Sequence, residues 1–161
     1  MKSRIFLAVL LSVFMFLAFG CASLRHAGYK TDYIHSQVQD YAYTSENFSE
    51  VWGKARELLF ENGYQVRGPG LGYHVETDWA MTGEHTQRRY MVTSYAVQNG
   101  AAYVVHFDYV EEDNSAGYSS TRNGRDYDME YELLRRVDYN QWSRIQNDAT
   151  RYADERLAAE K

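Results

Sequence analysis

The alternation of hydrophobic and polar residues in this chain is clearest in two long runs that predict a β-hairpin. Residues 86–97 and 101–111 are rich in Tyr, Val and Thr, and Asn99-Gly100, a dipeptide typical of two-residue hairpin turns, lies between them. A two-residue turn places Gln98 opposite Ala101 and sets the register of the whole hairpin. The predicted pairs are Ala96–Tyr103, Ser94–Val105, Val92–Phe107 and Tyr90–Tyr109 on an apolar face, and Thr93–His106 and Met91–Asp108 on a mixed face that is exposed or only partly covered.

Shorter strands are predicted before this hairpin. Residues 41–44 and 64–67 are typical of short strands, and residues 71–79 alternate over their whole length. The alternation predicts a half-buried strand that places Leu71, Tyr73, Val75, Thr77 and Trp79 on one face and His74, Glu76 and Asp78 on the other.

A helix is predicted between the first two of these strands. Ser45 is a suitable N-cap, and Asn62-Gly63 supplies a C-terminal stop. Gly53 inside the helix costs about 1 kcal/mol relative to Ala, so we expect that it lets another backbone come close. The apolar face of this helix comprises Phe48, Val51, Trp52, Ala55, Leu58 and Leu59.

The last third of the chain is predicted to be mostly helical. A first helix follows from residue 126, and a second begins at Asp138 and Gln141, which are spaced as a capping pair. The apolar residues are Met129, Leu133, Leu134 and Val137 in the first helix and Trp142, Ile145, Ala149, Tyr152 and Leu157 in the second. The order of elements predicts an α+β fold, in which a two-layer antiparallel sheet packs against an early helix and a long C-terminal helix. This order resembles the helix-grip arrangement.

The N-terminus is predicted to be a secretory signal peptide of residues 1–20. Lys2 and Arg4 precede an apolar run, Ile5–Phe19, that is shorter than the roughly 20 residues a membrane span needs. Its end, Ala18-Phe19-Gly20-Cys21, resembles the lipobox of bacterial lipoproteins, although Ala18 stands where Leu is usual and Phe19 where a small residue is usual. The resemblance implies cleavage before Cys21 and lipidation of that residue with diacylglycerol and a further acyl chain such as palmitate. Because Ala22 is not Asp, it also implies an outer-membrane anchor facing the periplasm in a cell with two membranes.

The charge balance and the polar segment after the signal complete the domain organisation. Residues 21–40 are interpreted as a flexible tether with a reach of about 25 Å, and residues 41–161 as a single α+β domain. The chain carries 17 Lys and Arg against 22 Asp and Glu, which argues against binding to nucleic acid. Cys21 is the only cysteine, so no disulfide is expected.

The sequence contains no complete catalytic signature. His74, Glu76 and Asp78 share one strand face, with His106 and Asp108 in the hairpin. If the strands form a meander, residues 86–97 separate these two groups by about 10 Å, too far for one metal ion to bridge. The acidic pairs Glu111–Glu112 and Glu130–Glu132 are interpreted as solvated charge. We therefore expect no enzyme activity, no metal and no cofactor.

A protein-interaction role is the preferred functional hypothesis. Residues 112–125 form a polar loop that lacks the calcium-loop pattern, and Tyr118 and Arg122 in it are candidate partner contacts because long loops on rigid scaffolds commonly bind. The segments Asn62-Gly63-Tyr64 and Thr77-Asp78-Trp79 resemble helix-grip envelope lipoproteins such as the lipoprotein C component of the outer-membrane barrel-assembly machinery. The resemblance implies a lipid-anchored module that binds an envelope protein during envelope assembly or maintenance. The alternatives are a carrier of a small apolar ligand in a groove between the sheet and the terminal helix, and an enzyme that uses His74, Glu76 and Asp78.

Overall fold

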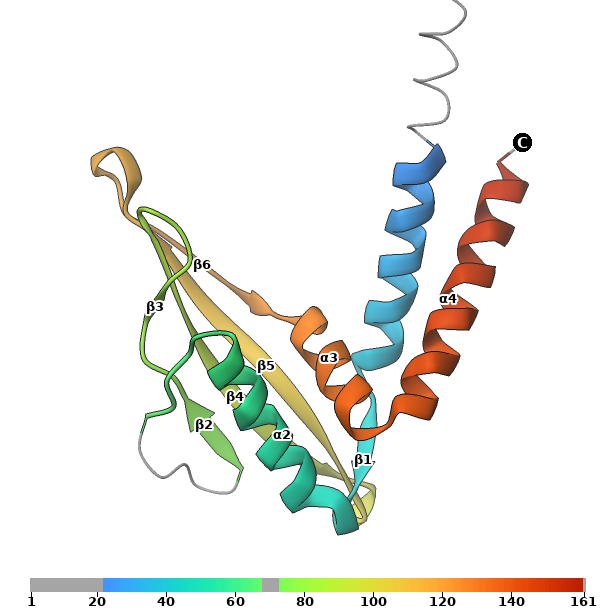
Figure 1. Ribbon diagram of the computed structural model, residues 1–161, viewed down its shortest axis with the longest axis horizontal. Helices are drawn as coiled ribbons and strands as arrows, with labels where there is room; N and C mark the ends of the chain where they lie inside the picture. Colours follow the sequence, from blue (N-terminus) through green and yellow to red (C-terminus); the bar gives the residue numbers. More distant parts are fainter. Residues whose placement is uncertain (1–21, 68–72, 161) are drawn as a thin grey trace, which may run out of the picture. The chain divides into compact units, whose positions relative to one another are not determined.

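The computed structural model describes residues 22–67 and 73–160, which form two compact units (Figure 1). One unit is Gln37–Ser143, and the other comprises residues 22–36 and 144–160. The sequence predicted one domain from residue 41 onward, whereas the last residues of the chain instead cluster with residues 22–36.

The larger unit is built on an open, antiparallel, six-stranded sheet, which confirms the predicted α+β class. Its strands are β1 (Ala42–Thr44), β2 (His74–Glu76), β3 (Ala80–Met81), β4 (Thr86–Val97), β5 (Ala102–Asp113) and β6 (Ser120–Arg125). The two long strands β4 and β5 pair with each other along their full length. β2 and β3 add to the outer edge of β4, while β1 and β6 add to the outer edge of β5.

The hairpin register that the sequence predicted is confirmed for the six predicted pairs from Ala96–Tyr103 to Tyr90–Tyr109. At the turn, Ala101 N–H donates to the Gln98 carbonyl at 3.2 Å. Asn99 and Gly100 have φ angles of 57° and 86°, as the two central residues of a type I′ turn require. The local sequence therefore accounts for both the turn and the pairing.

Helix α2 (Phe48–Glu61) buries the apolar face that was predicted for it. It begins after Ser45, because Ser45–Asn47 form a short 3-10 turn, η1. Gly63, at a φ of 84°, ends the helix in a Schellman motif, in which Gly63 N–H bonds the Phe60 carbonyl and Tyr64 N–H bonds the Leu59 carbonyl. The expected close approach at Gly53 is wrong, since a Cβ built there has nothing within 4 Å.

Helices α3 (Tyr127–Val137) and α4 (Tyr139–Ala159) follow β6. Asp126 accepts a hydrogen bond from Met129 N–H and caps α3. Asp138 accepts one from Gln141 N–H and caps α4, as the sequence predicted for this pair. The helix that packs on the sheet and on α2 is the shorter one, α3. The predicted C-terminal helical region is thus present, and its long helix α4 belongs to the other unit from Arg144 onward.

The core of the larger unit lies between one face of the sheet and helices α2 and α3 (Figure 1). Its largest fully buried side chains are Phe107, Leu58, Leu59, Leu133, Leu134, Val51, Val75, Val92 and Thr77. They come from β2 and the residue that follows it, from β4 and β5, and from the two helices, so the sheet and the helices depend on each other for burial.

Trp79 does not share the inner face with Val75 and Thr77, as the alternation predicted. β2 pairs Glu76 with Met91, whereas β3 pairs Ala80 with Arg88, so one more residue lies on the β2–β3 side than on β4. Such a bulge moves the following side chains to the other face. Trp79 is accordingly half-buried beneath the guanidinium of Arg89, which lies 5.0 Å from its ring centroid.

The smaller unit is a pair of antiparallel helices. Residues 22–38 are helical, which corrects the flexible tether expected over residues 21–40. Tyr33 packs on Tyr152 of α4 with ring centroids 5.2 Å apart, and Arg25 pairs with Glu160 at 3.0 Å. The helix period was missed because its contact face is made of Tyr and His as well as aliphatic residues; the half-buried members are Ala22, His26, Tyr29, Lys30, Tyr33, Ile34 and His35.

Candidate functional site

The two candidate partner contacts lie in the β5–β6 hairpin, Tyr118 in the connection between the strands and Arg122 in β6. Tyr118 is 82% exposed at the end of the β5–β6 hairpin, after a short turn at Ser115–Gly117. Arg122 lies within β6 opposite Glu111. The predicted polar loop over residues 112–125 is therefore wrong for most of its length. The predicted lipidation site, Cys21, lies outside the described residues.

The acidic and histidine residues that could have formed a metal site are divided between strands. His74 Nε2 lies 3.2 Å from a carboxylate oxygen of Glu76, while Asp78 pairs with Arg67 instead. β4 lies between β2 and β5. This is the strand order that the argument against a shared metal ion assumed, and β4 separates these residues from His106 and Asp108. In residues 22–67 and 73–160, no group of three or more His, Cys, Asp or Glu side chains is placed to hold a metal ion.

The sheet face opposite α2 and α3 carries several apolar side chains that lie outside the core. We call this surface the open face and define it by alternate residues of the two long strands: Arg89, Met91, Thr93 and Tyr95 of β4, and Val104, His106, Asp108 and Val110 of β5. Met91 is 42% exposed and Tyr95 is 51% exposed. On the covered face, by contrast, Val92 and Phe107 are almost completely buried.

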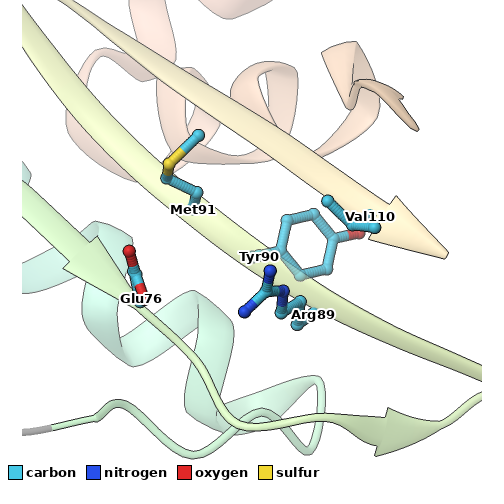
Figure 2. Close-up of a pocket in the computed structure, with 5 residues that line it drawn as sticks. All are labelled: Glu76, Arg89, Tyr90, Met91 and Val110. Atoms are coloured by element: carbon cyan, nitrogen blue, oxygen red, sulfur yellow. The ribbon is translucent and has the colours of Figure 1, made fainter.

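Two hollows adjoin each other on the open face. The smaller, of about 70 Å³, lies toward β2 and is bordered by Glu76, Arg89, Met91 and Val110 (Figure 2). The larger, of about 420 Å³, lies toward β6. Met91 and Val110 border both hollows, so an apolar pair stands between them, and the outer walls carry the charged residues Glu76, Arg89, Asp108 and Arg125.

His106 and Tyr95 form an aromatic contact at another part of the open face. Their ring centroids lie 5.1 Å apart, and Thr93 Oγ1 donates to the Tyr95 hydroxyl at 3.1 Å. Burial lowers the pKa of His106, and the nearby positive charge of Arg125 lowers it further. His106 is consequently neutral at pH 7, and it adds a polar but uncharged ring to this surface.

The most buried charged residue was missed by the sequence analysis. Glu130 is only 4% exposed, although the sequence suggested solvated charge. Its carboxylate accepts hydrogen bonds from Arg125 Nε at 2.7 Å, from Arg125 Nη2 at 2.8 Å and from Phe107 N–H at 3.1 Å. Phe107 lies where β1 has ended and β6 has not yet begun along the edge of β5, so Glu130 satisfies a strand N–H that has no neighbouring strand.

A second polar cluster joins β4 to the start of α3. The Tyr90 hydroxyl donates to Asp126 at 2.5 Å, and Arg88 pairs with Glu111 at 2.5 Å while lying over the ring of Tyr109. Burial raises the pKa of Tyr90, and its hydrogen bond to Asp126 raises it further. The Tyr90 hydroxyl therefore remains protonated and serves as a structural donor to the helix cap.

Comparison of the chain with protein-family models, with curated proteins and with solved structures found no match. Within the part of the chain that the structure describes, none of the helices combines the length and the apolar character needed to cross a membrane.

Proposed function

We propose that this protein is a lipid-anchored envelope lipoprotein that binds another envelope protein through the open face, as part of envelope assembly or maintenance. The proposal places lipid on Cys21 and the protein on the outer membrane, facing the periplasm, where the cell has two membranes. It assigns no catalytic residue and no cofactor.

The observation that carries the proposal is the apolar pair Met91–Val110 between two hollows. An apolar centre with a charged rim is the usual composition of a protein-binding patch. Methionine suits such a centre, because its flexible thioether adapts to the shape of the partner. The rim contains both signs of charge, with Arg89 and Arg125 against Glu76 and Asp108, so the expected partner surface is apolar with mixed charge around it.

Site-specific photo-crosslinking in the cell tests this proposal. A crosslinking amino acid at Met91 or Tyr95 is expected to capture one defined envelope protein, whereas the same amino acid at Arg56, on the exposed side of α2, is expected to capture none. Met91→Asp should abolish the capture without unfolding the protein, since Met91 is already 42% exposed. Equal capture from Met91 and Arg56 would refute the open face as the binding surface.

The anchor requires a separate test. Cys21→Ser should leave the domain folded but abolish membrane attachment, because the resemblance assigns the lipid to that thiol. The intact mass of the wild-type protein extracted from membranes should show loss of residues 1–20 and addition of acyl chains. An unmodified cysteine would contradict the anchor without affecting the argument for the open face.

A further inference from the structure

A third hollow, on the covered side of the sheet, contains features of a small-ligand site. It has a volume of about 350 Å³ and lies between the start of α2 and the turn end of β4 and β5. Its wall includes the rings of Phe48, Tyr73 and Tyr103 together with Ser45 and Ser94. This volume falls within the range of about 300 to 1,000 Å³ that is typical of ligand pockets.

The aromatic residues form a continuous apolar wall. Phe48 meets Tyr103 edge to face with ring centroids 4.6 Å apart, and it meets Tyr73 at 5.4 Å. Tyr103 is 4% exposed, whereas Tyr73 is 69% exposed. The hollow therefore has a buried inner side at Tyr103 and an exposed outer side at Tyr73.

Two hydroxyl groups in this wall lack a hydrogen-bond partner. Ser94 Oγ and Tyr103 OH are both buried and, among the described residues, neither has a donor or an acceptor within reach. Ser94 pairs with Val105 and Tyr103 pairs with Ala96, so the two residues are diagonal neighbours on the same face of β4 and β5. An unsatisfied buried hydroxyl is unfavourable for folding, and its presence beside a hollow suggests that its partner comes from outside the chain.

The charge around the hollow limits the class of ligand. Glu46 lies in the turn η1, and Glu50 lies in the first turn of α2. Burial raises the pKa of Tyr103, and the negative charge of Glu50 raises it further, so this hydroxyl is a protonated donor at neutral pH. The same negative charge disfavours an anionic ligand, and the aromatic wall favours a flat apolar one.

We propose that the hollow at Phe48, Tyr73, Ser94 and Tyr103 binds a small, uncharged, largely apolar molecule that carries a hydrogen-bond acceptor such as a carbonyl oxygen. The acceptor receives the hydrogen bond of Tyr103 or Ser94, and the apolar part packs on Phe48 and Tyr73. The site is independent of the open face, which lies on the opposite side of the sheet. It places a ligand site at the start of α2, whereas the sequence suggested a groove beside the terminal helix.

Two probes of nearly equal shape test the proposal by NMR titration. Acetophenone carries a carbonyl oxygen where cumene carries a methyl group. The protein is the mature chain from residue 21 with Cys21→Ser, so that no lipid competes for the probes. Acetophenone is expected to shift the resonances of Phe48, Ser94 and Tyr103 and to bind roughly threefold to tenfold more tightly than cumene, the value of one net hydrogen bond.

Tyr103→Phe with Ser94→Ala removes both donors and keeps the aromatic wall. In this double variant the preference for acetophenone is expected to disappear, while Tyr118→Phe, a matched change at an exposed tyrosine, should keep it. Tyr103→Phe alone should also raise the melting temperature or leave it unchanged, because it deletes an unsatisfied buried group. A lower melting temperature would show that the hydroxyl has a partner in the protein and would overturn the proposal.

Two further results would overturn the proposal as well: shifts centred outside the hollow, or an acetophenone preference that persists in the double variant. None of these results depends on the capture of a partner protein. Failure of the open-face proposal and failure of this site can therefore be distinguished.

Discussion

Replacement of Glu130 by Ala is expected to be among the most destabilising charge substitutions in the protein. The carboxylate accepts three hydrogen bonds, two from Arg125 and one from the buried N–H of Phe107. Leaving a buried N–H unsatisfied costs about 1 to 3 kcal/mol, and removing one partner of a buried ion pair costs about 3 to 5 kcal/mol in all. Arg125 keeps its hydrogen bond to the Gln39 carbonyl, so we expect a loss of about 4 kcal/mol.

Urea unfolding of residues 21–161 with Cys21→Ser at pH 7, followed by circular dichroism, measures this loss. Glu130→Gln keeps an acceptor for Phe107 N–H but loses the charge, so it should cost about half as much. Glu84→Ala is the control, because the Glu84 side chain is 90% exposed and such changes stay within about 0.5 kcal/mol. A loss below about 1 kcal/mol for Glu130→Ala would refute the reasoning that this carboxylate is needed at the edge of β5.

Three further substitutions test other parts of the structure. Gly53→Ala should stabilise the protein by about 0.5 to 1 kcal/mol in urea unfolding, because it adds a helix-favouring residue where the added Cβ meets nothing within 4 Å; a loss of stability would show a hidden contact. Phe107→Ala, at a fully buried position, should cost about 3 to 5 kcal/mol in the same assay, whereas a loss below about 1 kcal/mol would contradict its place in the core. Hydrogen bonding by Arg135 lowers the pKa of Glu132, with a further contribution from Arg136. Wild type should therefore be more stable than Glu132→Gln at neutral pH, by up to about 1 kcal/mol for such a partly exposed pair. This difference should disappear as the pH falls through the lowered pKa of Glu132. A difference that grows on acidification would contradict the predicted direction of the pH dependence.

The features that the sequence predicted correctly depend on residues close together along the chain. The β4–β5 hairpin follows from Asn99-Gly100 and the alternation on either side of it, and no distant residue is needed to set its register. The end of α2 at Gly63 and the cap of α4 at Asp138 are equally local, because each involves a residue and the backbone a few positions away. The apolar faces of these helices follow from their period, and they implied the α+β class.

The features that the sequence missed depend on partners far away along the chain. β6 is polar and largely exposed, so it has no alternation, and pairing with β5 alone makes it a strand. The helix of residues 22–38 is recognisable only beside α4, where Tyr33 finds Tyr152. Glu130 became a buried residue because Arg125 and the free N–H of Phe107 meet at one point of the sheet edge.

The candidate sites also depend on segments that are far apart along the chain. The hairpin register placed Met91 on the outward face. The hollows beside it, however, require the packing of β2 and β6 against the central hairpin. Ser94 and Tyr103 were predicted on the apolar face, yet their missing hydrogen-bond partners depend on how α2 lies over them. Local residues set backbone conformation through short-range sterics and hydrogen bonds, whereas burial and hydrogen-bond satisfaction depend on segments that only the folded chain brings together.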